Sequence, residues 1–429
     1  MSLSRRQLMM IGGSIAVILI IVLIFIFGSR RQEPARLSGN LEFWGVFDEP
    51  AVMNEIIAAY RKDRPKMEIN YTQLNSAAYE SDLINALATA KGPDLFMFQS
   101  SWLPKHYDKI QPLTESQLPL VNFRRLFPTV VEQNFAPDGV IYALPLYIDT
   151  LAMFYNKDIF DAKGVALPPK TWLELQNLIP KIRELDKTGK IIKAAAAIGG
   201  SDKSVNRAAD ILNLLMLQSG VPMVNQDFTQ ANFGQDGLAT LKFYTQFANP
   251  GGQYYTWNEN FPYSVDSFAE GQTAVMFNYS HQIAAIKDKN PFLNFTVAPM
   301  PQPNYAETVI NWANYWGLAV SAQSRQSAAA WDFISWLTTD EQASTKYLQL
   351  TGRPPALRSL IPDYKTNPEL GVFAEQALTA RSWPQIDSLV VENAFSKMIA
   401  DVINGKSSAD KAIRQTEEEI SQLMRKRIQ

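Results

Sequence analysis

A regular alternation of strand-like and helix-like segments constrains the fold of this chain more than any other feature. Three strand-like segments occupy residues 41–44, 67–71 and 95–98, and the last is a continuous apolar run typical of a strand buried on both faces. The segment that opens at Pro50 and the stripe at residues 79–90 have the apolar spacing of helices packed on a sheet. This βαβαβ order predicts an open, mostly parallel sheet covered by helices.

Two loops follow the first and third predicted strands, at residues 45–49 and 99–102. In open α/β sheets, ligands bind in the crevice beyond the carboxyl ends of the strands, so we expect both loops to contribute to a binding site. The first contains Asp48, which suits hydrogen bonds from ligand hydroxyls and equally suits a cap for the following helix. The second contains Ser101 and Trp102. These three side chains are therefore candidate ligand contacts.

The amino terminus carries an uncharged and strongly apolar segment after a short flank at residues 1–7. Residues 8–28 are long enough, at about 1.5 Å of rise per residue, to cross the roughly 30 Å hydrocarbon core of a bilayer. The segment runs into Arg30 and Arg31 and lacks the small-residue cleavage site of a secretory signal. We interpret residues 8–28 as a transmembrane anchor or uncleaved signal, with a cleaved signal as the alternative, and residues 29–40 as a polar linker. Arginines flank the span on both sides, so charge does not decide its orientation.

Composition excludes several classes of function. The chain has no cysteine, which removes disulfides, thiolate metal sites and cysteine nucleophiles. Its two histidines, His106 and His281, stand far apart and in no metal-binding motif. The net charge of −2, from 40 basic and 42 acidic residues, provides no electrostatic footprint for nucleic acid. We therefore expect no metal, no cofactor and no nucleic-acid partner.

Six short motifs follow one another in a fixed order along the chain. They are Gly92-Pro93-Asp94, Tyr142-Ala143-Leu144-Pro145 followed by Tyr155-Asn156-Lys157-Asp158, Pro169-x-Thr171-Trp172-x-Glu174, Phe268-x-x-Gly271-x-x-Ala274-x-Met276, Trp316-Gly317-Leu318-Ala319-Val320 and Gly352-Arg353-Pro354-Pro355. The co-linear set, covering nearly everything from about residue 40 to the end, resembles the family 1 extracellular solute-binding proteins. This family contains maltose-binding protein and other sugar receptors of ABC importers.

The resemblance implies an α/β fold with two lobes, the type II periplasmic-binding-protein-like fold, in which each lobe is a sheet covered by helices. The apolar segment at residues 8–28 would precede both lobes as a single transmembrane helix. Lobe 1 would comprise residues 41–147 plus about 300–355, and lobe 2 residues 148–299 plus about 356–429. The crossings between lobes are expected near residues 146–150, 298–301 and 354–360. The solute would be enclosed between the lobes by hinge closure.

Sugar sites combine planar aromatic surfaces with a few fixed carboxylate or amide acceptors. By match to the family pattern, Asp149 follows the first crossing as an acidic hydrogen-bonding residue, with a hinge salt bridge as its structural alternative. Tyr279 and His281 open a predicted helix, and Trp316 and Trp383 stand where such receptors place a stacking ring; for each tryptophan the alternative is ordinary core packing. The candidate ligand-binding residues are Asp48, Ser101, Trp102, Asp149, Tyr279, His281, Trp316 and Trp383.

These features predict the extracytoplasmic solute-binding subunit of an ABC importer, monomeric and tethered to the cell membrane, which delivers a carbohydrate to permease subunits. A binding protein for a polyol phosphate, polyamine or peptide, and a sensor module, remain alternatives. A glycoside-acting enzyme is a further one, because Asp48 and Asp149 could face each other across a sugar, although no catalytic motif such as G-x-S-x-G or H-E-x-x-H occurs. A phosphorylated solute needs clustered Arg or Lys, whereas the selected loops carry acids, serine and aromatics and favour a neutral polyol.

Overall fold

The predicted strand–helix alternation builds the first of two sheets in the computed structural model, which describes residues 38–428. β1 (Gly39–Gly45) pairs in parallel with β2 (Met67–Gln73) and with β3 (Leu95–Gln99). β11 (Trp316–Val320) runs antiparallel to β3 and to β4 (Leu144–Pro145), so the strand order is β2-β1-β3-β11-β4. The parallel arrangement predicted for the first three strands is confirmed.

Helices with an apolar stripe cover the first sheet. Pro50 starts α2, whose buried face includes Met53, Ile56 and Tyr60, as the spacing of these residues predicts. At the edge of the sheet a Cβ on Gly317 would lie 2.4 Å from the carbonyl oxygen of Leu144, so the close approach of β11 to β4 requires glycine. The helices of this lobe are α2 (Pro50–Arg61), α3 (Tyr79–Ala88), α4 (Leu103–His106), η1 (Tyr107–Lys109), α5 (Leu120–Leu126), α6 (Thr129–Phe135), α13 (Ser327–Thr339), α14 (Glu341–Thr351) and α15 (Ile361–Tyr364).

The second lobe is built on another five-stranded sheet, in the order β6-β7-β8-β5-β9. Only β7 and β8 pair in parallel, and β5 lies antiparallel to both β8 and β9. The strands are β5 (Ala152–Asn156), β6 (Glu184–Leu185), β7 (Ile191–Ala196), β8 (Thr273–Asn278) and β9 (Phe295–Ala298). The helices are α7 (Lys157–Ala162), α8 (Trp172–Ile182), α9 (Ala208–Gln218), α10 (Leu238–Thr245), η2 (Gln246–Ala248), α11 (Ser264–Ala269), α12 (Gln282–Lys289), α17 (Ser388–Ile403) and α18 (Ala409–Ile428).

Local capping fixes the start of α8. The Thr171 hydroxyl accepts a hydrogen bond from the Glu174 amide at 3.1 Å, as the motif predicts. From this capping box and the apolar spacing that follows it, the sequence predicts a helix whose buried stripe runs from Leu175 to Leu185. The predicted end is wrong, because the helix ends at Ile182, two residues after Pro180, and Leu185 lies exposed in β6. The proline cannot donate its backbone N–H, which weakens the last turn.

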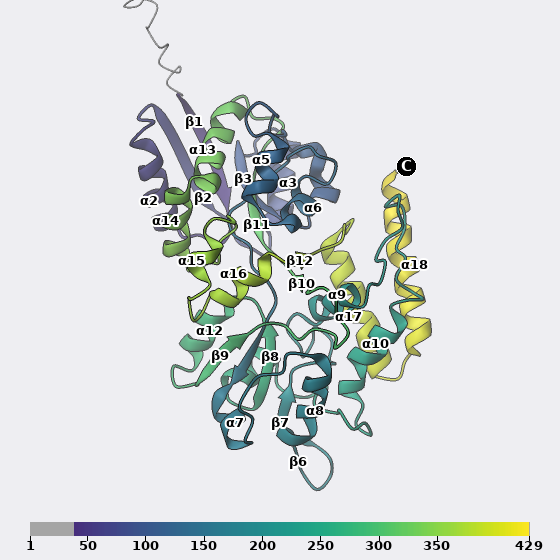
Figure 1. Cartoon of the computed structure of the whole chain (residues 1–429). Coiled ribbons are helices and arrows are strands. Elements are labelled where there is room, and N and C mark those ends of the chain that lie inside the picture. The colour runs from purple at the N-terminus through teal and green to yellow at the C-terminus, as the bar shows by residue number, and fades with distance from the viewer. Residues whose placement is uncertain (1–37, 429) are drawn as a thin grey trace, which may run out of the picture.

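The lobes meet at a waist where segments distant in sequence run side by side (Figure 1). Leu151 donates its amide to the Trp312 carbonyl at 2.9 Å, and Asn314 donates its amide to the Asp149 carbonyl at 3.0 Å. Next to this pair, β10 (Asn311–Trp312) pairs in parallel with β12 (Ala380–Arg381). α16 (Gly371–Ala377) spans the waist, because Phe373 packs with the second lobe and Ala377 with the first.

Packing suggests where the chain passes between lobes. Trp312 belongs to the core of the second lobe and Ala313 to the core of the first. Ala380 still packs in the first core, whereas Trp383 packs in the second. We propose that the second crossing lies at residues 312–313 and that the third is completed at residues 381–383, after α16 has already contacted the second lobe through Phe373. The family pattern leads us to expect these crossings at residues 298–301 and 354–360.

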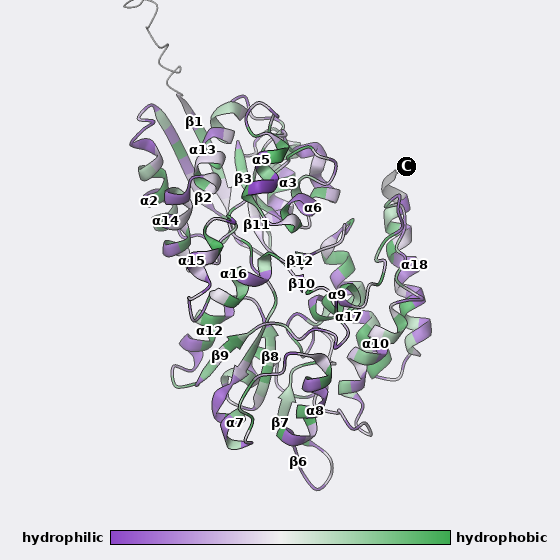
Figure 2. Ribbon diagram, in the orientation of Figure 1, coloured by the Kyte–Doolittle hydropathy of each residue, from purple (hydrophilic) through white to green (hydrophobic). Residues whose placement is uncertain are grey.

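Hydropathy follows the layers of the fold. In Figure 2 the hydrophobic colour is strong on buried strands such as β7 and β8, and the hydrophilic colour is strong on the outer helix α18. Over residues 38–428 no helix is both long and apolar enough to cross a membrane. The anchor predicted at residues 8–28 lies outside the residues that the structure describes.

Candidate ligand-binding site

The two lobes face each other across three connected cavities. The largest, the hinge cavity, has a volume of about 860 Å³. It shares Gln99, Asn314 and Trp316 with a cavity of about 300 Å³, the tryptophan pocket. That pocket shares Ser101 and Trp383 with an outer pocket of about 380 Å³. These shared residues place the three cavities next to one another, and we call the three together the cleft.

Tryptophans from both lobes line the tryptophan pocket. They are Trp102, Trp312, Trp316 and Trp383. The rings of Trp102 and Trp316 pack edge to face with their centroids 5.1 Å apart. The indole N–H of Trp383 donates to Asn213 Oδ1 at 2.8 Å, which fixes the orientation of that ring. The indole N–H of Trp312 likewise donates to Asp210 Oδ1 at 3.1 Å, so two of the four rings are held by hydrogen bonds to neighbouring side chains.

Amide groups and one free hydroxyl accompany these rings. The amide side chains that line the pocket are Gln99, Asn134, Asn213, Asn314 and Gln385. Ser101 Oγ is buried between the tryptophan and outer pockets and has no hydrogen-bond partner among the described residues. Amides both donate and accept, so this lining suits a ligand with many hydroxyl groups.

Asp149 lies on the first crossing and lines the hinge cavity. Its Oδ2 accepts hydrogen bonds from Ser280 Oγ at 2.7 Å and from the Ser280 amide at 3.0 Å, and its Oδ1 accepts from the Thr150 amide at 2.9 Å. Burial raises the pKa of this carboxyl to about 6, although these hydrogen bonds favour the ionised form. Within residues 38–428 these partners are neutral donors, so the hinge salt bridge weighed as its alternative is not formed. Asp149 ties the crossing to the loop before α12.

Asp48 is held by other side chains of its own lobe. Arg353 Nη2 lies 3.0 Å from Asp48 Oδ1, and the Tyr347 hydroxyl donates to Oδ2 at 3.0 Å. Asp48 does not cap α2, whose N-cap position is Glu49. The Arg353 guanidinium also lies over the Tyr147 ring, 4.4 Å from its centroid, and lines the hinge cavity. Asp48 therefore positions Arg353, while Asp48 itself is not among the lining residues of the three cavities.

Tyr279 and His281 line the hinge cavity from the second lobe. Their rings stack with centroids 6.2 Å apart. Tyr279 is buried and donates its hydroxyl to Asp210 Oδ2 at 2.7 Å, whereas His281 is exposed at the cavity wall. The Arg207 guanidinium lies over the Tyr279 ring, with its Cζ 5.2 Å from the ring centroid.

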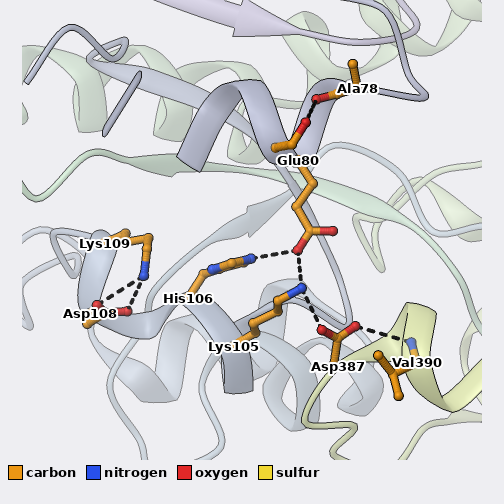
Figure 3. Close-up of polar contacts among 9 residues, drawn as sticks. Ala78, Glu80, Lys105, His106, Asp108, Lys109, Asp387 and Val390 are labelled. Atoms are coloured by element: carbon orange, nitrogen blue, oxygen red, sulfur yellow. Dashed lines mark hydrogen bonds and ion pairs between the residues drawn. The ribbon is translucent and has the colours of Figure 1, made fainter. Parts of the chain in front are cut away.

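An ion-pair network joins the lobes beside the tryptophan pocket (Figure 3). Lys105 is on α4, and its Nζ lies 2.6 Å from Asp387 Oδ2 and 2.8 Å from Glu80 Oε1. His106 Nε2 lies 2.8 Å from the same Glu80 oxygen. The hydrogen bond to His106, together with Lys105, lowers the pKa of Glu80 to about 2. Asp387 also caps α17 by accepting from the Val390 amide at 3.3 Å. We call Glu80, Lys105 and Asp387 the interlobe bridge.

The structure thus brings seven of the eight candidate residues to one cleft and places the eighth, Asp48, directly behind it. Sequence reasoning missed Trp312, Asn314, Arg207 and Arg353 as lining residues. Trp312 and Asn314 precede the Trp316 motif directly, so the motif is the sequence signal that points to their segment. Arg207 carries no local signal, because only the folding of the second lobe brings it to the cleft.

Comparisons with known proteins identify the family of this chain. A family model described as bacterial extracellular solute-binding protein matches residues 44–344. The chain is similar to the maltotriose-binding protein of Pyrococcus abyssi, with 24% identity over 394 residues that cover 88% of this chain and 81% of that protein. It is also similar to the multiple sugar-binding protein of Streptococcus mutans, with 23% identity covering 78% of this chain and 79% of the relative.

Solved structures share the two-lobed fold. The sugar-binding protein MalE of Xanthomonas citri superposes with a TM-score of 0.75 at 21% identity, covering 91% of this chain and 98% of that chain. An ABC transporter solute-binding protein of Thermotoga lettingae bound with α-D-tagatose gives 0.71 at 21% identity, covering 90% and 100%. At these identities the likeness establishes the fold.

Proposed function

Because the chain belongs to the family of bacterial extracellular solute-binding proteins, we propose that it is the extracytoplasmic receptor of an ABC importer and binds a carbohydrate between its lobes. The carbohydrate is then delivered to permease subunits. The relatives named above are binding proteins for maltotriose and for multiple sugars, which supports this class of solute.

The tryptophan pocket is the observation that carries this proposal. Four indole rings and five amide side chains from both lobes surround one cavity. Aromatic faces pack against the apolar faces of a sugar ring, and amides pair with its hydroxyl groups. Ser101 Oγ, buried without a partner in the described part of the chain, gains a hydrogen bond when such a ring enters. Three carboxylates, those of Glu80, Asp210 and Glu392, also line the pocket. Glu80 is paired with Lys105 and His106, and Asp210 accepts hydrogen bonds from Tyr279 and Trp312, so these two acids are engaged by the protein itself and favour a sugar over a polyamine.

We assign roles to the candidate residues on this basis. Trp102, Trp316 and Trp383 supply ring faces, and Ser101 supplies a hydroxyl contact. Asp149, Tyr279 and His281 contact the part of the solute that reaches the hinge cavity, and Asp48 acts through Arg353. The lobes close about the crossings at the waist, which brings the two halves of each cavity together.

The apolar segment at residues 8–28 serves as a membrane tether in this proposal, and residues 29–40 link it to the first strand. A spanning helix holds a receptor at the cell surface more firmly than one acyl chain does. The receptor is monomeric in this scheme and meets its permease in the plane of the membrane.

A glycoside-acting enzyme needs two carboxylates on opposite sides of a sugar. Asp48 does not supply one, because its oxygens are engaged by Arg353 and Tyr347. The binding-protein relatives also favour a receptor. A sensor that passes its signal to a kinase would use the same cleft, and it is distinguished by its membrane partner.

Thermal unfolding of the full chain tests the proposal, in a detergent that has no sugar headgroup. The panel contains mono- and oligosaccharides, polyamines, peptides and sugar phosphates, and each stabilising compound is recovered and analysed for turnover. Saturable stabilisation by an unchanged sugar is the expected result. Turnover of the sugar, or stabilisation by polyamines or peptides alone, contradicts the proposal.

A matched pair of variants assigns the binding to the cleft. Trp316→Ala removes a half-buried ring of the tryptophan pocket, and we expect it to weaken sugar binding about tenfold, or roughly 1.4 kcal/mol. Trp336→Ala removes a partly buried ring on α13 of the same lobe, outside the cleft, and should leave affinity unchanged. Equal losses in the two variants would place the sugar elsewhere.

A further inference from the structure

Arg207 occupies a strained and firmly held position at the edge of the hinge cavity. It precedes α9 with φ 68° and ψ 25°, a left-handed conformation that is unfavourable for a residue with a Cβ. Its neighbours are fixed: the Asn206 amide donates to Ser264 Oγ at 2.8 Å, and the Ala208 amide donates to Asp202 Oδ1 at 3.1 Å. The surrounding loop therefore holds the Arg207 side chain where it lines the cavity.

The Arg207 guanidinium has unused hydrogen-bonding capacity. Its Nε is buried without a partner, and no carboxylate in residues 38–428 lies within ion-pair distance of it. Asp210, three residues further on, gives its two oxygens to the Tyr279 hydroxyl at 2.7 Å and to the Trp312 indole N–H at 3.1 Å. Asp210 interacts electrostatically with Arg207 without forming an ion pair, so the charge is partly balanced while the buried Nε–H still lacks an acceptor. An anionic group in the cavity would supply that acceptor.

The other cations of the hinge cavity are already engaged. Arg353 is paired with Asp48 at 3.0 Å, and Lys287 is paired with Glu369. The carboxylate of Asp149 is satisfied by Ser280 and the Thr150 amide. Among the described residues that line this cavity, Arg207 is the one cation that forms no ion pair, so it is the cation with which an anionic group of the solute can pair.

We propose that the solute is an acidic sugar of the uronic acid class, whose carboxylate is bound by Arg207 in the hinge cavity. Its uncharged rings then lie among the indoles of the tryptophan pocket. A planar guanidinium matches a carboxylate with two parallel hydrogen bonds, and one unpaired cation balances a singly charged carboxylate better than a phosphate. The proposal rests on the proposed function and narrows it, replacing the neutral polyol favoured by the loops alone.

Titration calorimetry on the full chain tests this, in a detergent that lacks a sugar headgroup. The probes are galacturonate, glucuronate and oligosaccharides that carry one such uronate residue, their methyl esters, the matching neutral galactose and glucose sugars, and sugar phosphates. We expect at least one uronate to bind 10-fold to 100-fold tighter than its methyl ester. Esterification removes the charge and keeps the ring, so this comparison needs no variant.

Two substitutions at Arg207 locate the effect. Arg207→Gln should abolish the preference for the free acid over its ester, and Arg207→Lys should retain part of it, because lysine keeps the charge and loses the planar fork. Arg325→Gln, at an exposed position outside the cleft, is the matched control and should leave the preference intact. Far-ultraviolet circular dichroism checks that each variant is folded.

The outcomes separate this inference from the function on which it rests. Equal affinity for acid, ester and neutral sugar overturns the inference and leaves the sugar receptor standing, with Arg207 donating to hydroxyl groups. Tighter binding of sugar phosphates than of any uronate also overturns it. Binding of polyamines or peptides alone overturns both proposals.

Discussion

The interlobe bridge should set how readily the cleft closes. Lys105 lies 2.6 Å from Asp387, and their side chains are 33% and 19% exposed. Exposed ion pairs contribute about 0.2–1 kcal/mol, and we take the upper end, about 1 kcal/mol, because Asp387 is mostly buried. This free energy holds the lobes in the observed arrangement. Its loss shifts the closing equilibrium, and with it the affinity for the solute, about fivefold.

Asp387→Asn removes the charge and keeps the helix cap. Asparagine is as good an N-cap as aspartate, so the hydrogen bond from the Val390 amide to the side chain persists and α17 should stay intact. Asp387→Ala removes both the ion pair and the cap, and it should lower the free energy of unfolding by about a further 1 kcal/mol. The comparison separates the bridge from the cap.

A double-mutant cycle with Lys105→Met measures the pair itself, with calorimetry of a sugar that the unmodified chain binds as the assay. We expect a coupling of about 1 kcal/mol in binding that declines as salt is raised. Small-angle scattering without solute should show a more open molecule for Asp387→Asn. A coupling below about 0.3 kcal/mol, or tighter binding by the variant, would refute the reasoning.

Two further predictions concern buried charges near the hinge. Burial raises the pKa of Asp149 to about 6, so this carboxyl binds a proton more tightly in the native state than in the unfolded chain. The protonated carboxyl therefore contributes stability at low pH, and this contribution is lost as the pH rises from about 4 to 6. Urea unfolding measures how much the free energy of unfolding changes between pH 4 and pH 7. This change should be smaller for Asp149→Asn than for the unmodified chain by up to about 3 kcal/mol, and equal changes in the two proteins contradict the prediction. Arg353→Met leaves Asp48 buried and unpaired and should cost about 3–5 kcal/mol of unfolding free energy. Adding Asp48→Asn should recover most of that cost, and the absence of recovery would contradict the ion-pair reading.

Local patterns predicted the elements of this fold well because each is specified by neighbouring residues. The stripe of α2 and the Thr171 cap of α8 are readable within a few positions. Leu185 was misassigned for the same local reason, since an apolar residue in phase with a helix does not reveal that the helix has already ended.

The site was predictable only where the fold rule or the family pattern pointed to a loop. Ser101 and Trp102 follow a strand end, and they do line the cleft. The partners of the candidate acids were out of reach, because Asp149 bonds Ser280 across 131 positions and Asp48 bonds Tyr347 across 299. The sequence also could not show that Arg207 forms no ion pair, because this depends on which carboxylates the fold brings next to the other cations.

The paired crossings at the waist restrict how the two lobes can travel. Leu151 and Asn314 bond across the two segments, at 2.9 Å to Trp312 and 3.0 Å to Asp149, so the segments cannot slide along each other without breaking these bonds. The lobes are therefore left with bending as their easy movement. Bending at the waist limits the closed arrangements that the two lobes can reach. A permease that contacts both lobes would then respond to their relative position, and it would need no contact with the solute to distinguish a closed receptor from an open one.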